Sequence, residues 1–190
     1  MRRRALLASL GVGCTTLSGC ATLASAPSFG VDPDARPEGM PVVLDAALAF
    51  EGSDERPPVV DVSMTNDSES KQDVTNSGPS DGLPFSDGYA DGPDGNRIAL
   101  VDSLSGIRYD GCWKGSRTTV GGNDAAAHET LSPGETMEKA LYLFNGPESS
   151  ECWPAGEYYF GEGWHIGETP YEMDYSDEHG YGWGFTVTIS

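Results

Sequence analysis

Apolar and polar residues alternate along several short stretches of the chain, a pattern typical of β-strands with one buried and one solvated face. The clearest alternation lies at the C-terminus, where large apolar residues share one face: Trp183, Phe185, Val187 and Ile189. Further strands are predicted at 42–50, 60–65, 97–104, 106–113, 137–145 and 157–160. The stretch 42–50 is rich in alanine and would also suit a helix. Ser105-Gly106 predicts a hairpin turn between the two strands that flank it.

About seven short strands, separated by turns rich in glycine and proline and with almost no helical periodicity, predict an all-β protein built as an antiparallel β-sandwich. The predicted domain covers residues 41–190. Residues 66–97 interrupt the alternation with Asp, Ser, Gly, Asn and Pro. We expect a long acidic surface loop there, with one short strand near 71–75. A second loop is predicted at 118–129.

The chain begins with a basic and then apolar leader. Three arginines precede residues 5–19, which carry no charge and are rich in Leu, Ala and Gly. Such a segment indicates a secretory signal peptide, because it is shorter than the roughly 20 apolar residues that span a bilayer. Arg3-Arg4, followed by Leu6 and Leu7, resembles a twin-arginine export signal. An ordinary secretory signal with a basic start is the alternative.

The tetrapeptide Leu17-Ser18-Gly19-Cys20 resembles the lipobox of bacterial and archaeal lipoproteins, which is an aliphatic residue, two small residues and a cysteine. Cys14 does not fit the pattern, because Gly11 stands where the aliphatic residue should be. The resemblance implies that export machinery and a signal peptidase remove residues 1–19. Cys20 would then carry a two-chain lipid, which is sufficient for stable membrane anchoring.

This reading predicts a flexible tether over residues 20–40 and a protein anchored on the extracellular face of the cell membrane. Unlipidated cleavage near Ala24-Ser25-Ala26, which would release the protein, is the alternative.

The chain is strongly acidic, with 11 Lys and Arg against 30 Asp and Glu and a formal net charge of −19. Because the leader holds three arginines and no acid, the remainder carries −22. High acidity with only three lysines resembles proteins of salt-loving archaea, since carboxylates stay hydrated and their mutual repulsion is screened in concentrated salt. Nucleic acid is not an expected partner, because its binding needs clustered basic residues.

Two cysteines remain beyond the lipobox cysteine Cys20, namely Cys112 and Cys152. In an extracellular protein such a pair indicates a disulfide. The bridge would close a loop of about 40 residues, which stabilises by roughly 4 kcal/mol in the chain-entropy model. Each cysteine is followed by a tryptophan, Trp113 and Trp153, whose ring would help to shield the sulfur.

No motif in the sequence indicates catalysis. His128, His165 and His179 have no histidine partner at metal-ligand spacing, and no nucleophile elbow, phosphate loop or dinucleotide fingerprint occurs. A calcium site is conceivable in the acidic loop, where four carboxylates lie among glycines: Asp81, Asp87, Asp91 and Asp94. Their spacing does not match an EF-hand, so we expect a solvated acidic loop and no cofactor, with a calcium site as the alternative.

A second acidic stretch is interleaved with aromatic residues. Its members are Glu162, Trp164, Glu168, Tyr171, Glu172, Asp174, Tyr175, Asp177, Glu178 and Tyr181. Aromatic rings among acids can bind sugars or cationic groups. Packing of the rings on the sandwich is the structural alternative.

The segments "LSPGETMEKALYLFN", "CWPAGEYYF" and "WGFTVTIS" resemble the last three strands of immunoglobulin-like modules in prokaryotic surface proteins, and also small β-sandwich proteinase inhibitors. The resemblance implies an immunoglobulin-like sandwich. Together with the leader it leads us to expect a lipid-anchored, non-catalytic binding or accessory protein with an unidentified extracellular ligand. An anchored proteinase inhibitor or small hydrolase and a calcium-stabilised structural module are the alternatives.

Overall fold

The computed structural model describes most of the chain after residue 25. The described residues are 26–76, 83–85, 87–104, 107–109, 112–115, 127–149, 151–167 and 180–190. They form an all-β protein with one short 3-10 helix, η1 (Pro93–Gly95). The strands are β1 (Phe29–Pro33), β2 (Val42–Phe50), β3 (Val59–Asn66), β4 (Gln72–Asn76), β5 (Gly88–Asp91), β6 (Arg97–Val101), β7 (Ile107–Tyr109), β8 (Cys112–Lys114), β9 (His128–Leu131), β10 (Thr136–Asn145), β11 (Gly156–Gly167) and β12 (Gly180–Ile189).

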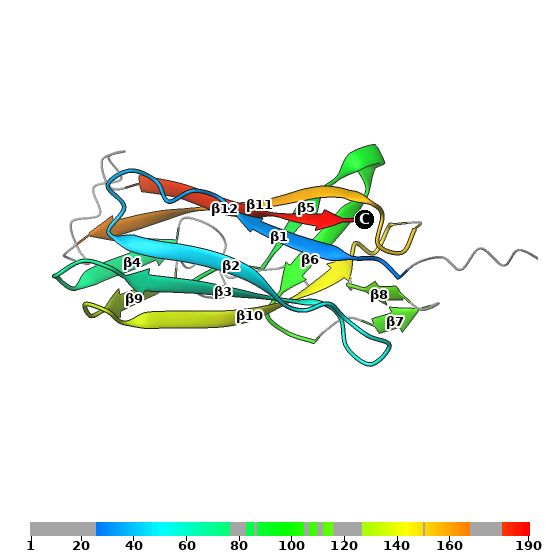
Figure 1. Cartoon of the computed structure of the whole chain (residues 1–190), viewed down its shortest axis with the longest axis horizontal. Helices are drawn as coiled ribbons and strands as arrows, with labels where there is room; N and C mark the ends of the chain where they lie inside the picture. Colours follow the sequence, from blue (N-terminus) through cyan, green and yellow to red (C-terminus); the bar gives the residue numbers. More distant parts are fainter. Residues whose placement is uncertain are drawn as a thin grey trace, which may run out of the picture.

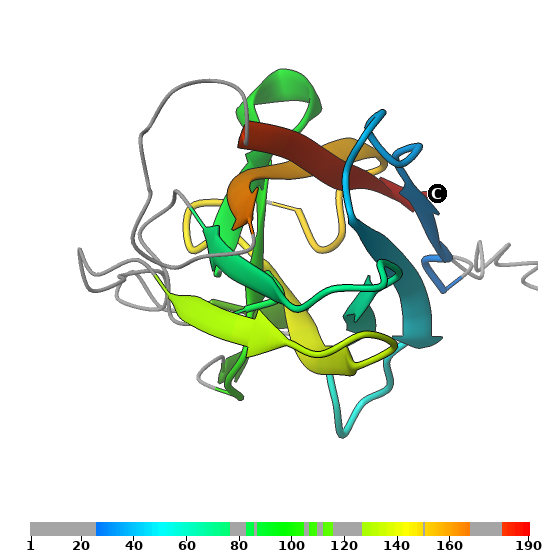
Figure 2. The same ribbon diagram turned by 90° about the vertical axis from the view of Figure 1, so that its left-hand side faces the viewer.

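The strands form two sheets that pack as a sandwich (Figures 1 and 2). The first sheet has the order β1-β12-β11-β4-β9, and the second has the order β2-β3-β10-β6-β5. Neighbouring strands within these orders are antiparallel. A short hairpin of β7 and β8 joins the second sheet through one parallel pair, Lys114 with Asn145 of β10. Figure 1 places this hairpin at the end of the sandwich where β1 begins and the chain ends.

The core lies between the sheets and is rich in aromatic residues. Phe85 contacts three rings, with centroid distances of 6.0 Å to Trp164, 6.4 Å to Trp183 and 5.2 Å to Phe185. The alternating apolar residues of β12 all face this core and are at most 2% exposed, as the sequence predicted. Burial of these large rings supplies much of the hydrophobic stabilisation of the sandwich.

A smaller apolar cluster lies on the opposite face of the second sheet. It consists of Ala99, Val101 and Phe144, with the partly buried Tyr89, Trp113 and Tyr142 packed against it. The ring of Trp113 meets Phe144 at 6.5 Å with the planes at 72°. The β7–β8 hairpin therefore covers part of this face instead of leaving it to solvent.

The expected strands at 42–50, 60–65 and 137–145 are confirmed as β2, β3 and β10. The structure has more strands than the seven or so expected. The hairpin predicted at Ser105-Gly106 is wrong, because β6 pairs with β5 and β10 whereas β7 pairs with β8. Residues 98–101 of β6 are fully buried, which suits a strand occupied along both edges.

Strands also occur in the segments predicted as the tether and as the two loops; strand β9 begins at His128, inside the loop predicted at 118–129. Residues 29–33 fall in the predicted tether but form β1, which pairs with β12 along the edge of the first sheet. The predicted acidic loop at 66–97 contains β4, close to the strand expected at 71–75, and also the unexpected β5. Strand β5 was not predicted from the sequence, because it is short and the Asp and Gly residues that flank it are typical of a loop.

The described part of the chain contains no helix with the length and hydrophobicity of a membrane-spanning segment.

The packing between β5 and β11 gives a direct test of the sandwich. A Cβ atom at Gly92 would lie 2.2 Å from Cε1 of the buried Tyr158, whereas a Cβ at Gly88 would meet nothing within 4 Å. We predict that Gly92→Ala lowers the free energy of unfolding by about 1–3 kcal/mol through overpacking. Gly88→Ala is the matched control and should leave stability almost unchanged. Equal denaturation midpoints for the two variants would contradict the packing described.

Candidate functional site at the disulfide loop

The segment between β10 and β11, residues 146–155, is the disulfide loop. The predicted bridge joins Cys152 of this loop to Cys112 at the start of β8, with a Cα–Cα distance of 5.4 Å. The two cysteines differ in their surroundings: Cys112 is 2% exposed, whereas Cys152 is an exposed residue. The bridge therefore links a buried residue to a residue at the surface.

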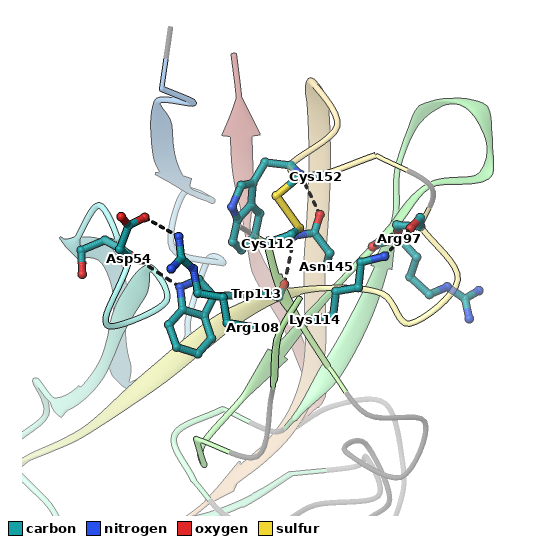
Figure 3. Close-up of a disulfide and its surroundings, with 11 residues drawn as sticks. Asp54, Arg97, Arg108, Cys112, Trp113, Lys114, Asn145 and Cys152 are labelled. Carbon is teal, nitrogen blue, oxygen red and sulfur yellow. Dashed lines mark hydrogen bonds and ion pairs between the residues drawn. A yellow bond between two sulfur atoms is a disulfide. The ribbon is translucent and has the colours of Figure 1, made fainter. Parts of the chain in front are cut away.

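Asn145, the last residue of β10, connects the disulfide loop to the second sheet (Figure 3). Its side chain is fully buried. The Nδ2 group donates to the Trp113 carbonyl at 3.0 Å and lies 2.9 Å from the Cys112 sulfur. The Oδ1 atom accepts a hydrogen bond from the Trp153 amide at 2.8 Å. One buried amide thus contacts both Cys-Trp dipeptides, and its desolvation is offset by these bonds.

Further hydrogen bonds hold the loop independently of the bridge. Lys114 Nζ donates to the Ser149 carbonyl at 3.0 Å, and Ser149 Oγ donates to the Arg97 carbonyl at 3.1 Å. The Gly146 amide donates to the same carbonyl at 2.8 Å. At the other end of the loop, the hydroxyl of the buried Tyr158 donates to the Pro154 carbonyl at 2.8 Å. Burial raises the pKa of Tyr158 above its usual value, with a smaller contribution from the charge of Glu151.

Trp153, next to the exposed cysteine, adopts a left-handed backbone conformation with φ of 53°. This conformation is unfavourable for a bulky residue and costs on the order of 1 kcal/mol or more. Two contacts hold Trp153 in this conformation. Its backbone N–H donates a hydrogen bond to Asn145, and its ring meets the ring of Phe29 edge-to-face with centroids 5.0 Å apart. The backbone beside Cys152 is therefore held in place by its neighbours.

Two clefts flank the disulfide loop. The disulfide cleft has a volume of about 390 Å³ and includes Cys152, Trp113, Trp153, Glu51 and Asp54 in its lining, together with Ala26 and Pro27 at the start of the described chain. The arginine cleft has a volume of about 570 Å³ and is lined by Tyr89, Gly95, Arg97, Gly146, Pro147, Glu148 and Ser149. Both volumes lie in the range of small-molecule sites.

An arginine–carboxylate ion pair lies at each of the two clefts. Arg97 forms an ion pair with Asp91, with Nε 2.6 Å from Oδ1, and its guanidinium lies 5.6 Å from the centre of the Tyr89 ring. The hydrogen bond and the charge of Asp91 raise the pKa of Arg97, so Arg97 carries a fixed positive charge. Beside the disulfide cleft, Arg108 pairs with Asp54 (Figure 3). The Trp113 indole donates to the Ser53 carbonyl at 3.0 Å.

The structure does not gather the three candidate calcium ligands that lie among the described residues. Asp87 accepts a hydrogen bond from the Asp102 amide at 2.8 Å, Asp91 pairs with Arg97, and Asp94 lies in η1 with φ of 57°. Asp81 lies outside the described residues. Within the described ranges, no cluster of three or more His, Cys, Asp or Glu side chains could hold a metal ion.

A histidine–carboxylate pair occurs on the first sheet. His128 Nε2 lies 3.7 Å from Oδ1 of Asp73, which is only 8% exposed. The Thr130 hydroxyl donates to the same carboxylate. A catalytic triad needs the hydroxyl to contact the imidazole, not the carboxylate, so this arrangement does not activate a nucleophile. His165 lies on β11 opposite Thr75 of β4, and His179 is outside the described residues.

The second acidic stretch is described only in part. Trp164 belongs to the core and is 1% exposed, so it offers no surface to a sugar. Tyr181 donates to the Gly39 carbonyl at 3.1 Å, and Glu162 accepts a bond from Asn76 at 2.8 Å. The acids and tyrosines at 168–178 lie outside the described residues, as do the leader, Cys14 and the lipobox with Cys20.

Comparison of the chain with protein-family models, with curated proteins and with solved structures finds no match. Sequence reasoning identified both cysteines but missed Asn145. The only available signal was a polar residue at the end of the apolar stretch "LYLFN", seven positions before Cys152. The hydrophobic pattern alone predicts that such a residue is the exposed end of a strand.

The central position of Asn145 can be tested by substitution. Asn145→Leu keeps a side chain of similar size but leaves the Trp153 amide and the Trp113 carbonyl without their partner. We predict a loss of about 3 kcal/mol in the free energy of unfolding, because unpaired buried polar groups are costly. Ser149→Ala, which removes one hydrogen bond from the same loop, is the control and should cost about 1 kcal/mol. Chemical denaturation measures both, and a smaller loss for Asn145→Leu than for Ser149→Ala would refute the assignment.

Proposed function

We propose that this protein is a lipid-anchored extracytoplasmic binding module. The observation that carries the proposal is the lipobox-like Leu17-Ser18-Gly19-Cys20, placed behind a signal-like leader and only nine residues before β1. A two-chain lipid on Cys20 would hold the domain at the membrane. The twin-arginine route and the salt-adapted acidic surface belong to the same proposal.

The sandwich supports an immunoglobulin-like relationship as part of this proposal. The three resembling segments correspond to β10, β11 and β12. Strand β10 lies in the second sheet, whereas β11 and β12 are antiparallel neighbours in the first. A crossing between sheets followed by a hairpin is also the arrangement of the last three immunoglobulin strands.

The position of the clefts suggests where a ligand would bind. Ala26 and Pro27 line the disulfide cleft, and Ala26 lies six positions after Cys20. Six residues span at most about 20 Å when extended. If Cys20 carries lipid, the disulfide loop and its clefts therefore face the membrane, and the opposite end of the sandwich points outward. The module would bind a ligand close to the membrane surface.

The anchor can be tested in cells with two matched cysteine substitutions. We predict that the wild-type protein enters the detergent phase on phase separation, and that its N-terminal peptide begins at Cys20 with a lipid on the sulfur. Cys20→Ser should lose the modification and enter the aqueous phase in greater part. Cys14→Ser should behave as the wild type, because Cys14 leaves with the leader. An unmodified N-terminal peptide that begins beyond Ala21 in the wild type would rule out the anchor.

A further inference from the structure

The Cys112–Cys152 bridge has the features of an exchangeable disulfide. Exchange requires an attacking thiolate to reach one sulfur and the other sulfur to leave as a thiolate. Cys152 is exposed and lines the disulfide cleft, whereas Cys112 is buried. An incoming thiolate can therefore reach Cys152 but not Cys112, so Cys152 is the residue attacked and Cys112 is the leaving group.

The buried side of the bridge is suited to a leaving thiolate. Asn145 Nδ2 lies 2.9 Å from the Cys112 sulfur, within hydrogen-bonding distance (Figure 3). A hydrogen bond to the charged form of a group favours that form. Asn145 is itself fully buried and held by Trp113 and Trp153, so the donor stays in position when the sulfur becomes charged.

The fold can survive the opening of the bridge. The disulfide loop retains the bonds from Asn145 to Trp153, from Lys114 to Ser149, and from Gly146 and Ser149 to the Arg97 carbonyl. The two sheets around it are held by the aromatic core. We therefore expect reduction to free two thiols within a folded domain.

We propose that Cys152 is a thiol-exchange site that accepts a small thiol as a mixed disulfide. The thiolate of the incoming compound attacks Cys152 Sγ, a new S–S bond forms, and the Cys112–Cys152 bond breaks with its electron pair leaving on Cys112. In the reverse step the Cys112 thiolate attacks Cys152 Sγ and expels the small thiolate. No net oxidant is needed, because each step exchanges one thiolate for another. This site goes beyond the anchored binding module and does not depend on the lipid.

The cleft indicates which thiols fit. Two tryptophans, Trp113 and Trp153, and two carboxylates, Glu51 and Asp54, lie in its lining. Arg108 neutralises Asp54 through its ion pair, which leaves the charge of Glu51 in excess. Aromatic rings and a net negative charge favour a cation. The preferred compound is thus an aminothiol with a protonated amine.

The first experiment locates the exchange in the oxidised wild-type full-length chain, kept folded in detergent without denaturant. The protein is treated with cysteamine, quenched with acid and mapped by mass spectrometry of its peptides. We expect the cysteamine adduct on Cys152 and a free thiol at Cys112. An adduct on Cys112, or no reaction until the protein unfolds, would overturn the proposal.

Two variants that each keep one cysteine of the bridge provide a matched comparison, with the reaction read on the peptide that holds the kept cysteine. In Cys112→Ser the remaining Cys152 should react with iodoacetamide at least tenfold faster than the remaining Cys112 of Cys152→Ser, because only the first thiol is accessible. Comparable rates, with both variants folded by circular dichroism, would contradict the assignment of roles.

The charge preference is tested with three thiols of similar size. Each rate with the wild-type protein is corrected for the thiolate fraction of the compound. We expect cysteamine to react fastest, 2-mercaptoethanol more slowly and 3-mercaptopropionate slowest, with about a tenfold difference between the first and the last at low salt. Glu51→Gln should reduce the spread, and Glu157→Gln, outside the cleft lining, should not. An unchanged order and spread in Glu51→Gln would exclude the cleft as the source of selectivity.

Discussion

One buried amide at the end of β10 organises the most distinctive part of this protein. Asn145 lies where the second sheet, the β7–β8 hairpin and the disulfide loop meet, and its side chain contacts a residue of each Cys-Trp dipeptide. A buried amide must satisfy its donors and its acceptor, so its partners cannot move independently without an energetic cost. The left-handed backbone of Trp153 is held in part by this requirement, because its amide donates to Asn145.

The aromatic core and the disulfide loop have different roles. The core between the sheets is formed by large rings such as Trp164, Trp183 and Phe185, whose burial gives a rigid frame. The loop at the end of the frame holds polar contacts, paired charges and an exposed sulfur. Functional groups in loops on a rigid scaffold are common in proteins, because the scaffold carries the stability that such groups do not supply. Our proposals place both ligand binding and thiol exchange at this end.

Strands with a strong alternation, such as β12 and β10, could be predicted from sequence because one face is apolar and the other is not. The partners of each strand could not be predicted, since pairing depends on contacts between distant segments. Strand β6 shows this, because its neighbour in sequence, β7, pairs elsewhere. The bridge was predictable because only two cysteines, Cys112 and Cys152, follow residue 20. The role of Asn145 was not, because its partners come together only in the folded chain.

We infer that Asn145 holds the disulfide loop in place whether or not the disulfide bridge is closed. Hydrogen exchange at the Trp153 amide measures this directly, since that N–H donates to Asn145. We predict that the amide stays protected when the bridge is reduced, and that it exchanges at least tenfold faster in Asn145→Leu with the bridge intact. Loss of protection on reduction, together with normal protection in Asn145→Leu, would show instead that the bridge holds the loop and that the amide is incidental.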